Sequence, residues 1–112
     1  FNVGHTKLDI KNWKGNLGKA GFHPDEQRRM DEWFNKVGVV DLGRKFAGEV
    51  EGPYTWWSMR GQAFDTNTGW RIDYHVSTSD LAKALTNVEI DKANSYAERW
   101  SDHAPITATF KL

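Results

Sequence analysis

The strictest pattern in the chain runs from Trp70 to Ser77, where apolar and polar residues alternate without a break. A period of two is typical of a β-strand, in which successive side chains point to opposite faces of a sheet. One face would carry Trp70, Ile72, Tyr74 and Val76, and the other would carry Arg71, Asp73, His75 and Ser77. Because two large aromatic rings share the apolar face, the segment predicts a sheet that packs against a second layer.

Shorter patterns predict the remaining elements. Apolar residues at helical spacing (Met30, Trp33, Phe34 and Val37) favour a helix that begins at Pro24 and ends at Gly38. Further strands are expected at residues 39–42, 54–59, 88–90 and 106–112, a second helix at 78–85, and a long Gly- and Asn-rich loop at 4–22. About five mostly consecutive strands and two helices indicate an α+β fold with a mostly antiparallel sheet.

Composition limits the function classes. At 112 residues the chain is at most one domain, and its fifteen basic and fifteen acidic residues give no net charge, so any attraction to nucleic acid must be local. A local surplus of positive charge is formed by Lys7, Lys11, Lys14 and Lys19, which outnumber the nearby Asp9. A solvated loop explains these lysines equally well. The absence of cysteine excludes disulfides and thiolate chemistry. No apolar run approaches eighteen residues, so no membrane partner is expected.

Four polar residues have the types that metal-assisted phosphodiester cleavage requires: Asn2, Asp73, Asp102 and His103. The turn Ser101 to His103 precedes Pro105 and stands at the entrance of the last expected strand. A carboxylate such as Asp73 could fix the tautomer of His103. By spacing alone, a purely structural Asp–His pair remains the alternative, and the four histidines show no metal-ligand spacing.

Five motifs favour the catalytic interpretation over the structural one: Asn2 with its neighbours, His5 to Asn16, Tyr54 to Trp57, Gly69 to Tyr74, and Ser101 to Pro105. Their order and spacing resemble the exodeoxyribonuclease III and apurinic/apyrimidinic endonuclease family, within the wider endonuclease/exonuclease/phosphatase fold. The resemblance implies a four-layer α-β-β-α sandwich of the DNase I-like type. Residues 1–112 are then expected to be the C-terminal half of one nuclease domain. The N-terminal half, absent from this chain, would carry the water-activating aspartate and a metal-binding glutamate.

The resemblance also implies roles for the catalytic candidates. Asn2 would hold the nucleophile and a phosphate oxygen, and Asp102 would lie beside a Mg²⁺ or Mn²⁺ ion. His103 would donate to the scissile phosphate as negative charge builds on it, and Asp73 would orient His103.

Further residues would bind DNA. Asn12 and Asn16 resemble loop residues that contact the DNA backbone. Trp56, Trp70 and Ile72 resemble an apolar pocket for a flipped-out sugar that lacks its base. Arg60, together with Arg71, would face the duplex.

The function expected from this resemblance is a DNA repair nuclease that cuts 5′ to abasic sites and removes nucleotides from DNA 3′ ends. Its partner would be double-stranded DNA. The full-length protein would be a monomeric bacterial, cytoplasmic enzyme, and the 112-residue chain alone would be inactive. The alternatives are a non-catalytic DNA-binding piece, or a phosphoesterase of the same wider fold that acts on phospholipid or inositol phosphates.

Overall fold

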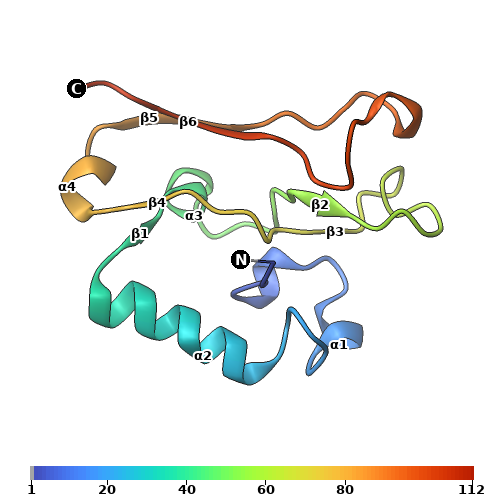
Figure 1. Ribbon diagram of the computed structural model, residues 1–112, viewed down its shortest axis with the longest axis horizontal. Helices are drawn as coiled ribbons and strands as arrows, with labels where there is room; N and C mark the ends of the chain where they lie inside the picture. Colours follow the sequence, from blue (N-terminus) through green and yellow to red (C-terminus); the bar gives the residue numbers. More distant parts are fainter. Residues whose placement is uncertain (1) are drawn as a thin grey trace.

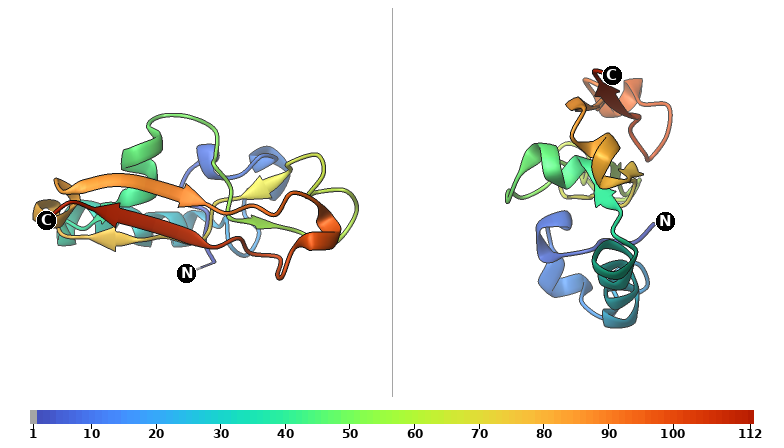
Figure 2. Two further views of the ribbon diagram at one scale, coloured as in Figure 1. Left: turned by 90° about the horizontal axis from the view of Figure 1, so that it is seen from above. Right: turned by 90° about the vertical axis from the view of Figure 1, so that its left-hand side faces the viewer.

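The computed structural model describes residues 2–112, so Phe1, with which the first motif begins, lies outside the described residues. Three layers are stacked across the molecule (Figures 1 and 2). One outer layer is the antiparallel hairpin of β5 (Leu85–Ile90) and β6 (Ile106–Phe110). The opposite layer contains helix α2 (Pro24–Glu32).

The middle layer consists of two short antiparallel pairs. β1 (Val40–Asp41) pairs with β4 (Val76–Ser77), and β2 (Trp56–Trp57) pairs with β3 (Gly69–Trp70). All three pairings among the described residues are antiparallel. The expected α+β class with antiparallel strands is confirmed.

Helix α2 forms as its sequence predicts. Pro24 occupies the first turn, and the His23 side chain accepts a hydrogen bond from the backbone N–H of Asp25 (3.1 Å). The helix buries Met30 and continues as a π-helical turn, Trp33–Val37. It ends where Gly38 adopts the left-handed conformation (φ +85°), which glycine adopts without steric cost.

The expected long loop at residues 4–22 is partly helical. It contains a 3₁₀ turn, Lys7–Asp9, and a one-turn helix α1, Trp13–Asn16. Backbone hydrogen bonds hold the segment against the middle layer, since the Lys11 N–H donates to the Gly69 carbonyl (3.0 Å). An isolated bridge also pairs Ile10 with Trp70. The segment therefore lies beside β3 as an ordered part of the molecule.

The prediction of one continuous strand from Trp70 to Ser77 is wrong. β3 ends at Trp70 and β4 begins at Val76. Arg71, on the expected polar face, is 1% exposed, because its guanidinium turns inward to bind Asp9 and Asp41. The backbone N–H groups of Ile72 and Asp73 donate to the Thr55 hydroxyl (both 3.1 Å) instead of to a neighbouring strand.

The strand expected at 39–42 is shorter because Leu42 begins an unforeseen helix, α3 (Leu42–Ala47). The Asp41 carboxylate caps α3 by accepting from the Arg44 N–H (3.1 Å). β2 is likewise shorter than the expected strand at 54–59.

The second expected helix is also shorter than predicted. α4 (Ser79–Ala82) is capped by Thr78, and Leu85 already belongs to β5. The last strand ends at Phe110, and a 3₁₀ turn, Tyr96–Glu98, interrupts the segment between β5 and β6.

The buried aromatic cluster joins the middle layer to the start of the hairpin layer. Tyr54, Trp57 and Phe64 pack with Ala104. The Trp57 N–H donates to the Asp102 carbonyl (3.0 Å), and the Ala104 N–H donates to the Thr55 carbonyl (2.7 Å). Residues 102–104 are thereby fixed against β2. In the part of the chain that the structure describes, no helix combines the length and the apolar character needed to cross a bilayer.

Candidate active site

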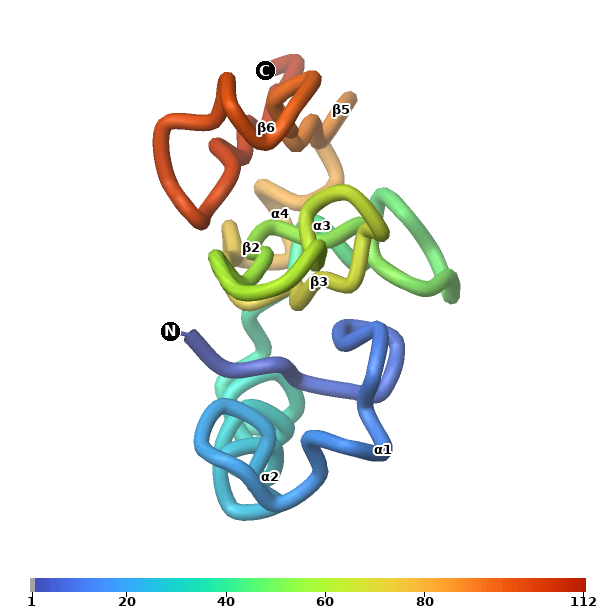
Figure 3. Tube along the Cα trace, turned by 90° about the vertical axis from the view of Figure 1, so that its right-hand side faces the viewer, coloured from blue at the N-terminus to red at the C-terminus, as the bar shows by residue number. Residues whose placement is uncertain are grey.

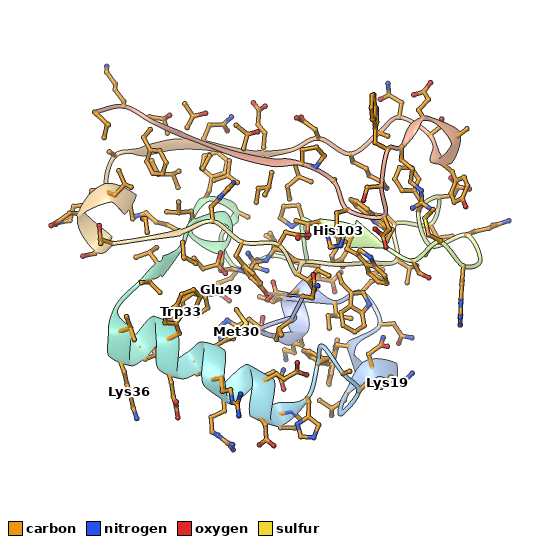
Figure 4. All side chains as sticks on the ribbon, viewed as in Figure 1. Lys19, Met30, Trp33, Lys36, Glu49 and His103 are labelled. Atoms are coloured by element: carbon orange, nitrogen blue, oxygen red, sulfur yellow. The ribbon has the colours of Figure 1, made fainter. Side chains whose placement is uncertain are left out.

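His103 and Asp73 form the centre of the candidate site, where the segment before β6 meets the segment after β3 (Figure 4). The His103 Nδ1 atom lies 2.7 Å from Asp73 Oδ2, although thirty residues separate them. The Asp73 backbone N–H donates to the Thr55 hydroxyl (3.1 Å), which positions Asp73, and an antiparallel bridge to Trp56 positions His103. Because Asp73 accepts at Nδ1, the opposite nitrogen, Nε2, is directed elsewhere and can serve a ligand.

Asp102 lies on the other side of the imidazole. Its Oδ1 atom is 3.9 Å from His103 Nε2 and 3.2 Å from the Ser101 hydroxyl. Its Oδ2 atom accepts a hydrogen bond from the Trp56 indole N–H (2.9 Å). This indole hydrogen bond is the main reason that the pKa of Asp102 lies below its ordinary value. Sequence reasoning assigned Trp56 only to a pocket wall and missed this bond.

Asn2 lies in a hollow next to this cluster. The hollow has a volume of about 420 Å³ and is lined by Asn2, Trp56, Trp70 and Ile72, together with Ala20, Gly21 and Glu26. The Trp56 and Trp70 rings meet edge to face, with their centroids 5.9 Å apart. The three residues predicted to form a pocket therefore share one concave surface, and Trp56 connects this surface to Asp102. Their role in binding DNA stays a prediction.

The asparagines predicted to contact the DNA backbone lie at the two ends of the one-turn helix α1. Asn12 precedes the helix and is exposed, and the Asn16 side-chain amide donates to the Asn12 carbonyl (2.7 Å). The ammonium groups of Lys7 and Lys14 lie 5.9 and 5.7 Å from the centroid of the Trp13 ring. Figure 1 shows α1 toward the same end of the molecule as β2 and β3, and Figure 3 views the molecule from that end. The asparagines and the lysines thus lie at the end that carries the hollow.

The two arginines expected to face DNA differ completely in exposure. Arg60 is exposed in the connection between β2 and β3. The expectation for Arg71 is wrong: its guanidinium is buried, with Nε 2.7 Å from Asp9 and two further bonds to Asp41 (2.9 and 2.6 Å). Arg44 also pairs with Asp9.

Burial alone would raise the pKa of Asp9, but Arg71 and Arg44 outweigh it and hold that pKa below its ordinary value. Sequence reasoning missed this network because its members are as many as 62 residues apart.

Asp102 suits a hard divalent cation, because its carboxylate is half exposed and its lowered pKa keeps it ionised. Within residues 2–112, however, no group of three or more acidic, histidine or cysteine side chains is arranged to hold a metal ion. The described residues therefore fit such an ion through Asp102, and a complete ligand set would require groups from outside residues 2–112.

Comparison with known proteins agrees with this geometry. Residues 1–103 match the model of the Endonuclease/Exonuclease/phosphatase family. An exodeoxyribonuclease of Bacillus subtilis is 40% identical over 95% of the chain, and a DNA-(apurinic or apyrimidinic site) endonuclease of Dictyostelium discoideum is 38% identical over the whole chain. The structure of the 3′ phosphatase NExo from Neisseria bound to product DNA hairpin superposes with a TM-score of 0.91, at 30% identity over the whole chain.

The chain belongs to the Endonuclease/Exonuclease/phosphatase family, since the family model covers most of its length. The Neisseria likeness confirms the expected fold. The chain spans 40% of the Bacillus relative, 30% of the Dictyostelium relative and 43% of the Neisseria chain.

Proposed function

We propose that the protein containing this chain is a divalent-metal-dependent DNA repair nuclease. It would hydrolyse phosphodiesters 5′ to abasic sites and remove nucleotides from DNA 3′ ends. One observation carries the proposal: the Asp73–His103 pair and the ionised Asp102 lie together at the border of the aromatic hollow. The names of the Bacillus and Dictyostelium relatives support the same chemistry.

His103 and Asp73 would act on the phosphate. The hydrogen bond from Nδ1 to Asp73 fixes the imidazole. When both ring nitrogens carry a proton, Nε2 can donate to a non-bridging phosphate oxygen as negative charge grows there. Asn2 would hold the attacking water and a phosphate oxygen. A bound Mg²⁺ or Mn²⁺ ion, with Asp102 as one ligand, would supply further stabilisation of that charge.

The hollow would receive the sugar of the abasic site. Its walls, formed by Trp56, Trp70 and Ile72, are apolar, and a deoxyribose without a base presents an apolar ring face to them. Asn12, Asn16 and the exposed Arg60 would contact the flanking double-stranded DNA through its backbone, without reading its sequence.

We further propose that residues 1–112 act as the C-terminal half of one nuclease domain. The water-activating aspartate and the metal-binding glutamate would then come from the other half. The full-length protein would act as a monomer in the bacterial cytoplasm. This arrangement accounts for the incomplete set of metal ligands among residues 2–112, and it predicts that the chain alone does not cleave DNA.

The test is cleavage of a duplex with one abasic site by the full-length protein and its His103→Ala and Asp73→Asn variants. Loss of a positioned proton donor reduces turnover by about 10²- to 10⁴-fold, and we expect His103→Ala to lie in that range. Asp73→Asn should lower turnover with little change in KM, because it acts through His103. Thr107→Ala on the exposed side of β6 is the control.

Near-normal turnover in both variants would contradict the site assignment. A phosphoinositide tested beside the abasic duplex separates the nuclease from a lipid phosphatase of the same fold. Salt-sensitive DNA binding by the full-length protein without metal-dependent cleavage would instead support a binding function.

A further inference from the structure

A second cavity borders His103 and shares no residue with the hollow. Its volume is about 410 Å³, and its walls include Trp57, Lys92, Arg99, Trp100 and His103. Trp56 lines the hollow and Trp57 lines this cavity, as expected for successive strand residues whose side chains point to opposite faces. The volume lies within the range of about 300–1,000 Å³ that small-molecule sites occupy. His103 therefore lines the second cavity, and its bridge partner Trp56 lines the hollow.

Two cations of the second cavity are held against aromatic rings. The Lys92 ammonium lies 4.8 Å from the Trp57 ring centroid, and the Arg99 guanidinium lies 4.1 Å from that of Tyr96. Neither cation forms an ion pair with any carboxylate of residues 2–112. Within those residues, the buried Nε atom of Arg99 also has no hydrogen-bond partner. Lys92 Nζ donates to the Phe64 carbonyl (3.0 Å) and to Asn67 Oδ1 (3.2 Å), both neutral acceptors. The positive charge of both side chains is thus available to an anion such as a phosphate.

The same cavity also offers acceptors. Asp91 and Glu98 line it, and both residues are exposed. Carboxylates accept hydrogen bonds from the exocyclic amino groups of nucleobases. The combination of cations and acceptors suits a ligand with a phosphate and a base better than it suits a simple anion.

Trp100 is the most exposed large apolar residue described in the molecule, and its side chain is completely open to solvent. Tyr96 and Met59 are also exposed, and the Arg99 guanidinium contacts both. Aromatic rings and guanidinium planes are the groups on which unpaired bases stack. Because base faces are covered inside a duplex, only a base outside the helix can stack on Trp100.

We propose that the second cavity, with Trp100 and Arg99 at its edge, binds an unpaired nucleotide of the DNA strand next to the bond that is cut. The proposal rests on the proposed nuclease function and adds a subsite to it. Stacking on Trp100 would hold a frayed or single-stranded end beside His103. The protein would then bind DNA with an unpaired end more tightly than blunt duplex.

The experiment measures binding of a fluorescein-labelled oligodeoxycytidylate, whose bases carry an exocyclic amino group, and of a blunt duplex to the full-length protein, by anisotropy without metal. Losing one base stack weakens binding by about 5- to 100-fold, so Trp100→Ala should show that loss for the single strand only. Trp100→Phe should restore most of the affinity. Arg99→Gln should weaken binding and reduce the slope of log Kd against log salt by about one.

Leu112→Ala is the matched control, because Leu112 is equally exposed and lies at the other end of the molecule (Figure 1). Unchanged single-strand binding by Trp100→Ala, or an equal loss for Leu112→Ala, would overturn the subsite. Abasic-site cleavage is measured in parallel. Cleavage with no effect of Trp100→Ala on single-strand binding refutes the subsite alone, whereas absence of cleavage by the parent protein refutes the nuclease function.

Discussion

At the residue scale, the Trp56 indole determines how readily Asp102 loses its proton. The indole N–H donates to Oδ2, and a donor to the charged form lowers the pKa of a carboxyl group. Asp102 therefore remains ionised at pH values where an ordinary aspartate begins to take up a proton.

Replacing the indole tests this effect. Trp56→Phe keeps an aromatic ring but removes the donor, so the pKa of Asp102 should rise toward the ordinary value of about 3.9. Because the charged form is then less favoured, the acidic limb of metal-dependent activity should move to higher pH. The measurement is an NMR titration of the Asp102 carboxyl carbon. Trp70→Phe, which keeps the Trp56 bond, should leave the titration unchanged. An unchanged midpoint in Trp56→Phe would show that the indole does not lower the pKa of Asp102.

At the element scale, four buried or half-buried charges join segments that are distant in sequence. Asp9 ends the 3₁₀ turn, Asp41 belongs to β1, Arg44 to α3, and Arg71 follows β3. Arg71 bonds to both carboxylates, and Arg44 bonds to Asp9. The network replaces the hydrogen-bond ladder that a continuous strand through Arg71 would have provided.

Removing the Arg71 guanidinium from this network should lower the free energy of unfolding. Arg71→Met keeps the volume but leaves Asp9 and Asp41 short of a cation, and uncompensated buried charges of this kind destabilise by about 3–5 kcal/mol. Urea unfolding should show that loss. Arg60→Met, which changes an exposed arginine, should stay within about 0.5 kcal/mol of the parent. A similar small change in Arg71→Met would mean that the network does not stabilise the fold.

Local sequence patterns predict some of these elements and fail for others. Helix α2 is encoded locally, by Pro24 at its start, Gly38 after its last turn and apolar spacing between them, so the sequence predicts it well. The alternation after Trp70 misleads because Arg71 bonds to Asp9, 62 residues away, and no local pattern contains that pairing. The proximity of Asp73 and His103 could be predicted only from the family resemblance. The Trp56–Asp102 bond gives no sequence signal.

At the scale of the whole molecule, Trp57 helps to join the hairpin layer to the middle layer. Trp57 is 3% exposed, packs edge to face on Phe64 and bonds through its backbone to Asp102. The position of His103 relative to Asp73 therefore depends on core packing as well as on their own hydrogen bond.

Truncating this core residue should affect stability and the site together. Trp57→Ala should destabilise the protein by about 3–5 kcal/mol, the usual cost of deleting a buried tryptophan side chain. Hydrogen exchange should accelerate at the Ala104 amide, which bonds to Thr55. Trp100→Ala removes the same side chain from a fully exposed position and should leave the unfolding midpoint unchanged. Equal effects of the two changes would show that the layers are joined elsewhere.

The position of Trp56 has a thermodynamic consequence. Trp56 lines the hollow, and its indole N–H donates a hydrogen bond to the Asp102 carboxylate. A ligand in the hollow that moves the Trp56 indole must change the proton affinity of Asp102. By thermodynamic linkage, protonation of Asp102 must then change the affinity for that ligand by the same factor. Binding in the hollow and ionisation of Asp102 are thus thermodynamically coupled, so a ligand that displaces the indole would raise the pKa of the Asp102 carboxyl and weaken its own binding.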